Sequence, residues 1–289
     1  MLFAVACKNE TVLPKYTVSF DAAGGSEVKA ITVDTGAKVS KPVDPTRVGY
    51  LLVDWYLGED VYDFDTPVSS DITLKAVWGK AVGTEADLRT AIEEGNSSII
   101  VLTNDVAIKK ALYIDGNKNI ELDMNRKKIS LDADSEAYGI ITVKGKGKLK
   151  ITGNGFFGYT DTYYNTETTA AGQNVGYIVT VMDDAELTVD NGSFYGAMGC
   201  IRLGKERNVQ GETAKAYING GEFKSEVKYA NHYWTFNKMD GTTTEFVITG
   251  GKFLKFNPAK GGTENPDEDW VAKNCTVEAS GDYFIVKSK

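Results

Sequence analysis

Short runs in which apolar and polar residues alternate cover most of the chain and predict β-strands. Residues 16–20 and 28–33 alternate in this way, and glycine-containing turns separate them. After residue 95, similar short runs continue to the C-terminus, and none of them shows the period of a helix. The pattern therefore predicts a mostly β protein.

One segment, residues 83–95, breaks the alternation and predicts a helix. Its sequence is GTEADLRTAIEEG, and its apolar positions fall at helical spacing: Leu88, Ala91 and Ile92. Thr84 or Glu85 would provide the N-cap, and Gly95 would end the helix as a C-cap. We expect this helix to precede a long series of strands.

The strands after the helix recur as repeats. In each repeat an apolar residue is followed, after a turn, by two more: Ile114, Ile120 and Leu122; Val143, Leu149 and Ile151; Val181, Leu187 and Val189. A second mark, Gly-x-Phe, ends at Phe157, Phe194, Phe223 and Phe253. The repeats follow one another at intervals of 29 to 38 residues, which is typical of stacked units that share one core. A β-sandwich is the competing architecture.

Composition limits the classes of function. The chain has 289 residues and a net charge of −8, which argues against a nucleic-acid partner, since phosphate binding needs clustered Lys and Arg. His232 is the single histidine, and no cysteine pair has zinc spacing; Cys200 and Cys275 lie in apolar runs that predict buried free thiols. We therefore assign no metal site, no cofactor and no catalytic residue, and we favour a protein that is not an enzyme.

Two adjacent carboxylates, Asp183 and Asp184, raise the question of a catalytic pair. Asp183 follows Val181 by two residues, and the equivalent place in the two preceding repeats holds Gly145 and Gly116. Glycine at such a place indicates a turn. A glycosidase needs two carboxyl groups that converge across a substrate. We predict that Asp183 and Asp184 form an exposed turn.

Large aromatic residues in residues 16–79 predict a small domain of its own. Trp55, Tyr56 and Trp78 would fill its centre, because a domain of this size depends on large side chains for its core. We interpret the two tryptophans as core residues rather than as residues that stack on a ligand.

This segment resembles the Listeria–Bacteroides repeat, also called the internalin B-repeat. The resemblance rests on YTVSFDAAGG, PTRVGY, DWY and DFDTPVSSDITLKAVW, within residues 16–78. Asp54 stands where the family often has glycine. The resemblance implies a β-grasp fold and a cell-surface protein in which the module acts as a spacer or an interaction unit. It implies no enzyme activity.

Residues 80–289 resemble a right-handed, single-stranded parallel β-helix of the pectate-lyase-like class. NIELDMNRKKISL resembles the first coil of that class, and GGKFLKFNPA with NCTVEASGDYFIV resembles the terminal coil of surface and phage-associated β-helix proteins. The resemblance implies that the predicted N-terminal helix caps the first coil and protects its edge. The chain would then join a small β-grasp module to a parallel β-helix.

The first residues resemble the end of a bacterial lipoprotein signal. LFAVAC ends at Cys7 as a lipobox does, and CKNE resembles the acidic export tag of Bacteroides-type surface lipoproteins. Ala4 stands where the motif usually has leucine, and a frayed apolar N-terminus is the alternative. The resemblance implies a signal remnant and linker over residues 1–15 and an outer-membrane lipoprotein on the extracellular side. Membrane contact would be only through a lipid anchor at Cys7.

Two loops rich in aromatic residues are the candidate ligand site. They carry these residues: Tyr159, Tyr163 and Tyr164 in the loop over 158–177, and Tyr229, His232, Tyr233 and Trp234 in the loop after Phe223. Both loops follow a Gly-x-Phe mark, so they should leave the same corner of coils two apart. Gly196, Ala197 and Gly199 of the intervening coil would form a floor. Aromatic faces suit sugar rings, so we predict a glycan-binding groove, with packing of these side chains onto the coil as the alternative.

Together these features favour an exported cell-surface lipoprotein that acts as a non-enzymatic adhesin or binds carbohydrate. Its partner would be a glycan or a host or surface protein. A polysaccharide lyase or glycoside hydrolase on the same scaffold is the second candidate. A structural spacer within a surface complex is the third.

Overall fold

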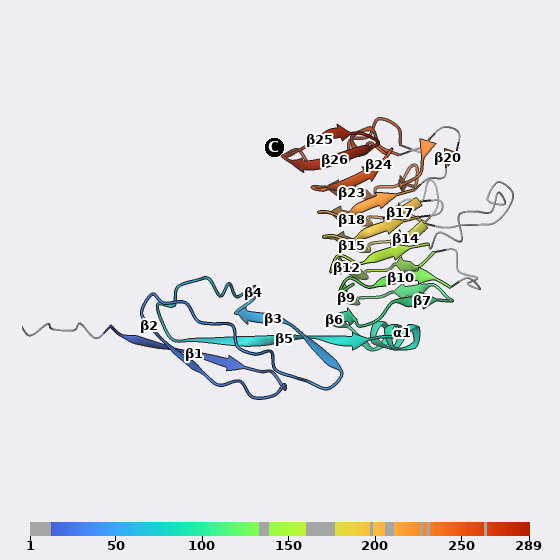
Figure 1. The fold of residues 1–289 in the computed structure, drawn as a ribbon. Coiled ribbons are helices and arrows are strands. Elements are labelled where there is room, and N and C mark those ends of the chain that lie inside the picture. Colours follow the sequence, from blue (N-terminus) through green and yellow to red (C-terminus); the bar gives the residue numbers. More distant parts are fainter. Residues whose placement is uncertain are drawn as a thin grey trace, which may run out of the picture. The chain divides into compact units, whose positions relative to one another are not determined.

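The chain divides into two compact units, Met1–Gly79 and Lys80–Lys289. The computed structural model describes the following residues: 13–132, 139–159, 177–196, 199–205, 211–225, 228–229, 232–262 and 265–289. Nearly all regular structure within them is β-strand, and one α-helix is present (Figure 1). The prediction of a mostly β protein with one helix is confirmed.

The first unit contains a mixed β-sheet. β1 (Lys15–Asp21) lies between its antiparallel neighbour β2 (Ile31–Asp34) and β5 (Ile72–Val82), to which it runs parallel. β3 (Tyr50–Leu57) pairs with β5 and with the short β4 (Asp60–Val61). One face of this sheet carries the aromatic core.

Trp55 forms the centre of that core. Its side chain is fully buried, and the ring of Phe20 meets it edge to face with 4.9 Å between ring centroids. Trp78 packs against the same cluster, and its indole N–H donates to the carbonyl of Ala22 at 2.9 Å. A side chain on Gly25 would overlap the Trp78 ring. Both tryptophans therefore belong to the packing of this unit, as predicted.

Three stacks of parallel strands form the second unit (Figure 1). The first stack begins where the end of β5 pairs in parallel with β6. It contains β6 (Ser97–Leu102), β9 (Asn119–Asp123), β12 (Lys148–Thr152), β15 (Glu186–Val189), β18 (Lys215–Ile218) and β23 (Glu245–Ile248). The second contains β7 (Val106–Ile108), β10 (Lys128–Leu131), β13 (Phe156–Gly158), β16 (Ser193–Tyr195), β19 (Glu222–Lys224) and β24 (Gly251–Leu254). The third contains β8 (Leu112–Ile114), β11 (Ile141–Val143), β14 (Tyr177–Val181), β17 (Gly199–Leu203) and β22 (Phe236–Lys238). The chain passes through the stacks in turn, so each of the first five repeats adds one strand to each stack, and the last adds β23 and β24.

The register of these strands is the one that the repeats predict. Val143 pairs with Ile114 on one side and Val181 on the other, and Leu149 lies in the same way between its counterparts in β9 and β15. The strands within each stack are parallel, whereas a β-sandwich consists of antiparallel sheets. The β-sandwich alternative is therefore wrong.

The phenylalanines of the Gly-x-Phe marks form a ladder inside the second unit. Phe157, Phe194, Phe223 and Phe253 are register partners on successive strands, and all are buried. Their ring centroids follow one another at 5.9, 4.8 and 5.2 Å. The mark thus identifies an inward position that the same side chain fills in four consecutive repeats.

A C-terminal hairpin ends the second stack. β25 (Cys275–Ser280) and β26 (Tyr283–Ser288) are antiparallel to each other, and β26 also pairs antiparallel with β24. A short 3₁₀ helix, η3 (Pro258–Lys260), precedes them. β26 therefore covers the edge that β24 would otherwise expose.

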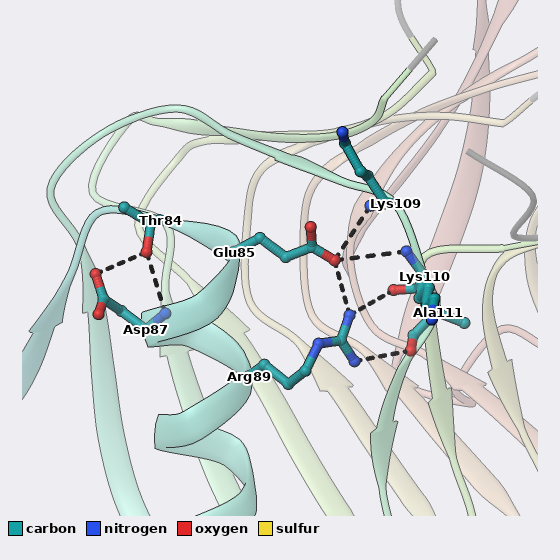
Figure 2. Close-up of polar contacts among 7 residues, drawn as sticks. All are labelled: Thr84, Glu85, Asp87, Arg89, Lys109, Lys110 and Ala111. Atoms are coloured by element: carbon teal, nitrogen blue, oxygen red, sulfur yellow. Dashed lines mark hydrogen bonds and ion pairs between the residues drawn. The ribbon is translucent and has the colours of Figure 1, made fainter. Parts of the chain in front are cut away.

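The helix α1 (Glu85–Glu94) opens the second unit, as predicted. Thr84 is its N-cap: the hydroxyl accepts the backbone N–H of Asp87 at 3.1 Å and donates to the Asp87 carboxylate at 2.8 Å (Figure 2). Gly95 follows the last turn, and its N–H donates to the carbonyl of Ala91 at 3.1 Å. The predicted apolar face is buried: Leu88, Ala91 and Ile92.

Two charged side chains fasten α1 to the segment between β7 and β8. Glu85 Oε1 accepts a hydrogen bond from Arg89 at 2.8 Å and from the backbone N–H groups of Lys109 and Lys110 at 3.1 and 3.4 Å (Figure 2). Arg89 also donates to the carbonyls of Lys110 and Ala111 at 2.8 and 3.3 Å. The helix is thereby held against the first repeat.

Candidate functional site

Asp183 and Asp184 form an exposed turn between β14 and β15, as predicted. Asp183 has a φ of 60°, and Gly145 and Gly116, at the same place in the preceding repeats, have φ values of 63° and 68°. The backbone conformation therefore defines this position. The Asp183 carboxylate accepts the N–H of Gly145 at 2.9 Å, and that of Asp184 accepts the hydroxyl of Thr213 at 2.9 Å. Both carboxylates join neighbouring repeats, which accounts for them without catalysis.

The first aromatic loop lies largely outside the described residues, and so do Tyr163 and Tyr164. Tyr159 is described, and its side chain is 1% exposed within the core. Its backbone N–H donates to the carbonyl of Tyr195 at 3.0 Å, so the parallel ladder of the second stack continues through this residue. Its side chain consequently shares the inward orientation of Phe157. This corrects the prediction that Tyr159 lines an open groove.

The second aromatic loop forms a short antiparallel hairpin. β20 (Lys228–Tyr229) and β21 (His232–Tyr233) pair, with Tyr229 opposite His232. Trp234, which follows, is partly buried. The backbone of Tyr229, His232 and Tyr233 therefore lies in one hairpin. Of these three residues and Trp234, only Trp234 has a described side chain.

The predicted floor between the loops is packed at Gly199. A side chain on Gly199 would overlap the backbone carbonyl of Trp234 and the ring of Tyr177. Tyr177 itself is buried. The absence of a side chain at Gly199 therefore makes room for the Tyr177 ring rather than for a ligand.

A ladder of glycines shapes the turns between the first and second stacks. Gly192, Gly221 and Gly251 have φ values of 113°, 104° and 116°, which residues with a side chain rarely adopt. A Cβ on Gly221 would lie 3.2 Å from the carbonyl oxygen of Gly192 and 3.3 Å from the Phe223 ring, and matching contacts recur at the other two glycines. The glycine of each Gly-x-Phe mark therefore leaves the turn without a side chain next to the phenylalanine ring.

An open groove of about 380 Å³ lies along this glycine ladder. It is lined by the turns, by polar side chains and by the last strand: Asn154, Asn191, Gly192, Ser193, Gly220, Gly221, Glu222, Gly251, Lys252, Ile285 and Val286. We call it the turn groove. Ser193, Glu222 and Lys252 are register partners on β16, β19 and β24, and Ile285 of β26 pairs with Lys252. The turn groove thus offers hydroxyl, carboxylate, ammonium and amide groups beside an apolar wall.

Glu222 is held in place at the centre of this row. Its Oε1 accepts the hydroxyl of Tyr283 at 2.8 Å and lies 3.0 Å from the ammonium of Lys224. Both contacts fall on Oε1, so Oε2 can accept a hydrogen bond from a ligand hydroxyl. The Tyr283 contact also ties β26 to β19, two strands away.

The surroundings of Glu222 keep it charged. Partial burial alone would raise the pKa of Glu222, but the hydrogen bonds from Tyr283 and Lys224 outweigh it, and the pKa is lowered. The hydrogen bond to Glu222 raises the pKa of Lys224, and burial together with the same carboxylate raises the pKa of Tyr283. Across the neutral range the cluster therefore consists of a carboxylate, an ammonium and a neutral phenol.

The groups that line the turn groove are ones that form hydrogen bonds and ion pairs. Glu222 is the one carboxylate among its lining residues, whereas glycoside hydrolysis uses two. Within the described part of the chain, no three His, Cys, Asp or Glu side chains are grouped so that they could hold a metal ion.

Cys200 and Cys275 are buried free thiols, as predicted. Burial raises the pKa of Cys200 to about 12, so it is not a nucleophile at neutral pH.

The Gly-x-Phe marks are recognisable in the sequence, but the turn groove beside them was not predicted. The glycine of each mark could have indicated the groove. A glycine that recurs at one place in each repeat leaves that place without a side chain in every turn. No sequence pattern indicated the apolar wall of the groove, which Ile285 and Val286 form. Ile285 reaches the groove through a hairpin that returns antiparallel to β24, whereas the repeats before it all pair in parallel.

The first unit matches a known domain family. Residues 16–77 match the family of the Listeria-Bacteroides repeat domain. The resemblance inferred for this segment from its motifs is therefore confirmed.

Two proteins of Evansella cellulosilytica are similar to part of this chain. One, named "Putative Gly-rich membrane protein", is 40% identical over 68 residues, which are 22% of this chain and 8% of that protein. The other, named "Putative membrane protein", is 39% identical over 67 residues, which are 22% of this chain and 10% of that protein. The similarity thus spans about a tenth or less of each relative's length. No solved structure matches the chain.

Every helix in the described part of the chain is too short or too polar to span a membrane. Cys7, the predicted lipidation site, lies outside the described residues.

Proposed function

We propose that the protein is an exported cell-surface protein that binds glycans without cleaving them. The Listeria-Bacteroides repeat at residues 16–77 supports a surface location, and so do the names of the two similar membrane proteins. The observation that carries glycan binding is the turn groove, where hydroxyl, amide, carboxylate and ammonium groups meet in one row. Sugars present hydroxyl groups that both donate and accept hydrogen bonds, which suits this mixed set.

In this proposal the second unit is a right-handed parallel β-helix of the pectate-lyase-like class with α1 as its cap, and the first unit is a β-grasp spacer. The support is the parallel register that continues through six strands of the first stack and five of the third. Such a scaffold aligns equivalent residues of successive repeats. The row from Ser193 to Lys252 is one such alignment.

The aromatic loops remain part of the proposed glycan surface. Tyr163, Tyr164, Tyr229, His232, Tyr233 and Trp234 would add apolar faces for sugar rings. Their contribution is separable from that of the turn groove, because the groove is lined by other elements.

The proposal also places a lipid anchor on Cys7, which would hold the protein at the outer membrane on the extracellular side. The LFAVAC sequence before CKNE supports it. In the native host, the Cys7→Ser variant should leave the membrane fraction and lose the mass of the lipid. A variant that stays in the membrane fraction with unchanged mass would rule out this anchor.

A glycan array tests the proposed function. The full chain carrying Cys7→Ser is applied, and each glycan that binds is then titrated by calorimetry. Glu222→Gln keeps the shape of the side chain but removes its charge, so we expect the affinity to fall about tenfold, as for the loss of one charge-assisted hydrogen bond. Between about pH 5 and 8 the affinity should stay constant, because the pKa of Glu222 is lowered and that of Lys224 is raised.

Glu186→Gln is the matched control for that titration. Glu186 is a carboxylate of the first stack that pairs with Lys148 at 2.9 Å and does not line the groove. Its removal should leave glycan affinity unchanged. A blank array, or equal affinities of wild type and Glu222→Gln, would reject glycan binding in the turn groove and favour a spacer role. Release of reducing ends from a bound glycan would favour the lyase or hydrolase alternative.

A further inference from the structure

The first and last strands of the first unit, β1 and β5, lie next to each other in the interior of its sheet (Figure 1). On its other side β1 pairs with β2, and β5 also pairs with β3. The register of β1 and β5 runs in parallel from the pair of Val18 and Ile72 to the pair of Asp21 and Lys75. The chain therefore enters this unit on one interior strand and leaves it on the neighbouring one.

A side-chain hydrogen bond joins the two strands at each end of this ladder. Before its first pair, the Asp71 carboxylate accepts the backbone N–H of Thr17 at 2.7 Å. Beyond its last pair, the indole N–H of Trp78 donates to the carbonyl of Ala22 at 2.9 Å. The connection between β1 and β5 is thus reinforced at both ends of their shared length.

The parallel direction of β1 and β5 decides how they respond to tension. A pull on the chain before Lys15 acts on the start of β1, and a pull on the chain after Gly79 acts on the far end of β5. In a parallel pair these are opposite ends, so the strands are drawn past each other and the evenly spaced bonds between them are loaded together. Several bonds must then break at once, which slows the unfolding step that governs resistance to force.

The chain leaves the first unit as a strand. Residues 80–82, the last three of β5, pair in parallel with residues 100–102 of β6, and both segments belong to the second unit. Tension on the second unit therefore reaches the first along the backbone of β5, in the direction that loads its ladder with β1.

We propose that the first unit is a load-bearing link, which keeps its fold when the second unit is bound to a fixed partner and the N-terminal side of the chain is held at the cell. The inference rests on the proposed function, because tension arises between a held end and a bound unit. Three observations carry it: the adjacency of β1 and β5, their parallel register and the two side-chain hydrogen bonds. It goes beyond a spacer, which needs length but no resistance to force.

Single-molecule force spectroscopy at constant force compares two pulling directions in the full chain carrying Cys7→Ser. Handles on the two termini load β1 and β5 from opposite ends. Handles on the N-terminus and on Ser70→Cys, an exposed position just before β5, load both strands from the same end, so their bonds open one after another. The gain in extension identifies the unit that unfolds, since the first unit is much the shorter.

At the same force, the first unit should unfold at least about tenfold more slowly when it is pulled by the termini, which corresponds to about one additional hydrogen bond in the barrier. Equal rates in the two directions would overturn the proposal. This comparison leaves β1, β5 and the hydrogen bonds between them unaltered, so it decides the question even if a variant of the ladder does not fold.

Asp71→Ala tests one of the two side-chain hydrogen bonds. Pulled by the termini, its first unit should unfold about tenfold faster than wild type, because a bond between the loaded strands is lost. Asp71→Asn keeps an oxygen acceptor and should restore most of the resistance. Ser26→Ala is the matched control, since the Ser26 hydroxyl accepts the backbone N–H of Thr46 at 2.9 Å outside β1 and β5. Its rate under force should equal that of wild type, and a rate as high as that of Asp71→Ala would contradict the proposal.

The pulling experiments need no ligand, which separates this inference from glycan binding. A blank glycan array together with direction-dependent unfolding would support the load-bearing link and reject only the glycan as its partner. Glycan binding together with equal unfolding rates in both directions would reject the link and leave the binding proposal intact.

Discussion

Glycines at two kinds of turn in the second unit differ in what surrounds them. Gly221 has a φ of 104° with a carbonyl oxygen and a phenylalanine ring close to where a Cβ would lie, whereas Gly116 has a φ of 68° and no atom within 4 Å of that place. We expect Gly116→Ala to lower the free energy of unfolding by about 1 kcal/mol through backbone strain alone. Gly221→Ala should cost about 3 kcal/mol, since overpacking is added to that strain.

Urea denaturation of the two variants measures this difference. Equal losses of stability would show that the crowding above Phe223 has no energetic weight. In that case the Gly-x-Phe mark would reflect backbone conformation only, and the turn groove would not depend on glycine for its open shape.

At the scale of elements, we expect the contact between α1 and the first repeat to depend on pH. Partial burial would raise the pKa of Glu85, but the hydrogen bonds from Arg89 and from the N–H groups of Lys109 and Lys110 outweigh it, and the pKa is lowered below 4.5. A carboxyl group with a lowered pKa in the folded state stabilises the protein above the unfolded pKa. That stabilisation is lost as the pH falls through the lower, folded pKa.

Glu85→Gln tests this contact. At pH 7 it should lower the free energy of unfolding by about 2 kcal/mol, because a charged acceptor of three donors is lost. The difference from wild type should shrink as the pH falls below the unfolded pKa, and it should vanish below the lower, folded pKa, where the wild-type carboxylate is protonated in both states. Glu93→Gln, at an exposed position of the same helix, should show no such difference at either pH. A difference that stays constant with pH would exclude the ionised form of Glu85 as its source.

Among the strands of the second unit, the elements that the sequence predicted are those whose signal repeats. Val143 and Leu149 recur at equivalent places because parallel stacking aligns inward apolar residues, so spacing alone defines the register. Tyr159 follows a Gly-x-Phe mark, where spacing does not show whether the strand ladder has ended, and its burial was not predictable. The contact of Tyr283 with Glu222 joins residues 61 apart through an antiparallel return, and no repeat encodes it.

At the scale of the whole second unit, the C-terminal hairpin contributes both to stability and to the proposed binding groove. Strands within a stack pair only with their neighbours, so the last strand of a stack exposes an edge unless another segment covers it. β26 covers β24 through four residue pairs and also supplies Ile285 to the wall of the turn groove. Removal of residues 273–289 should therefore expose the β24 edge, promote self-association and abolish glycan binding in the groove.

Tyr283→Phe separates the two roles of the hairpin. It removes the hydrogen bond to Glu222 but leaves the pairing of β26 with β24, so this variant should remain a monomer in light scattering after gel filtration, with a loss of about 1.5 kcal/mol in the free energy of unfolding. The truncated chain should instead grow in mass with concentration, because an unpaired edge templates further strands. A truncated chain that stays monomeric and keeps its stability would show that the second stack does not need a cover at β24. The hairpin would then serve the groove alone.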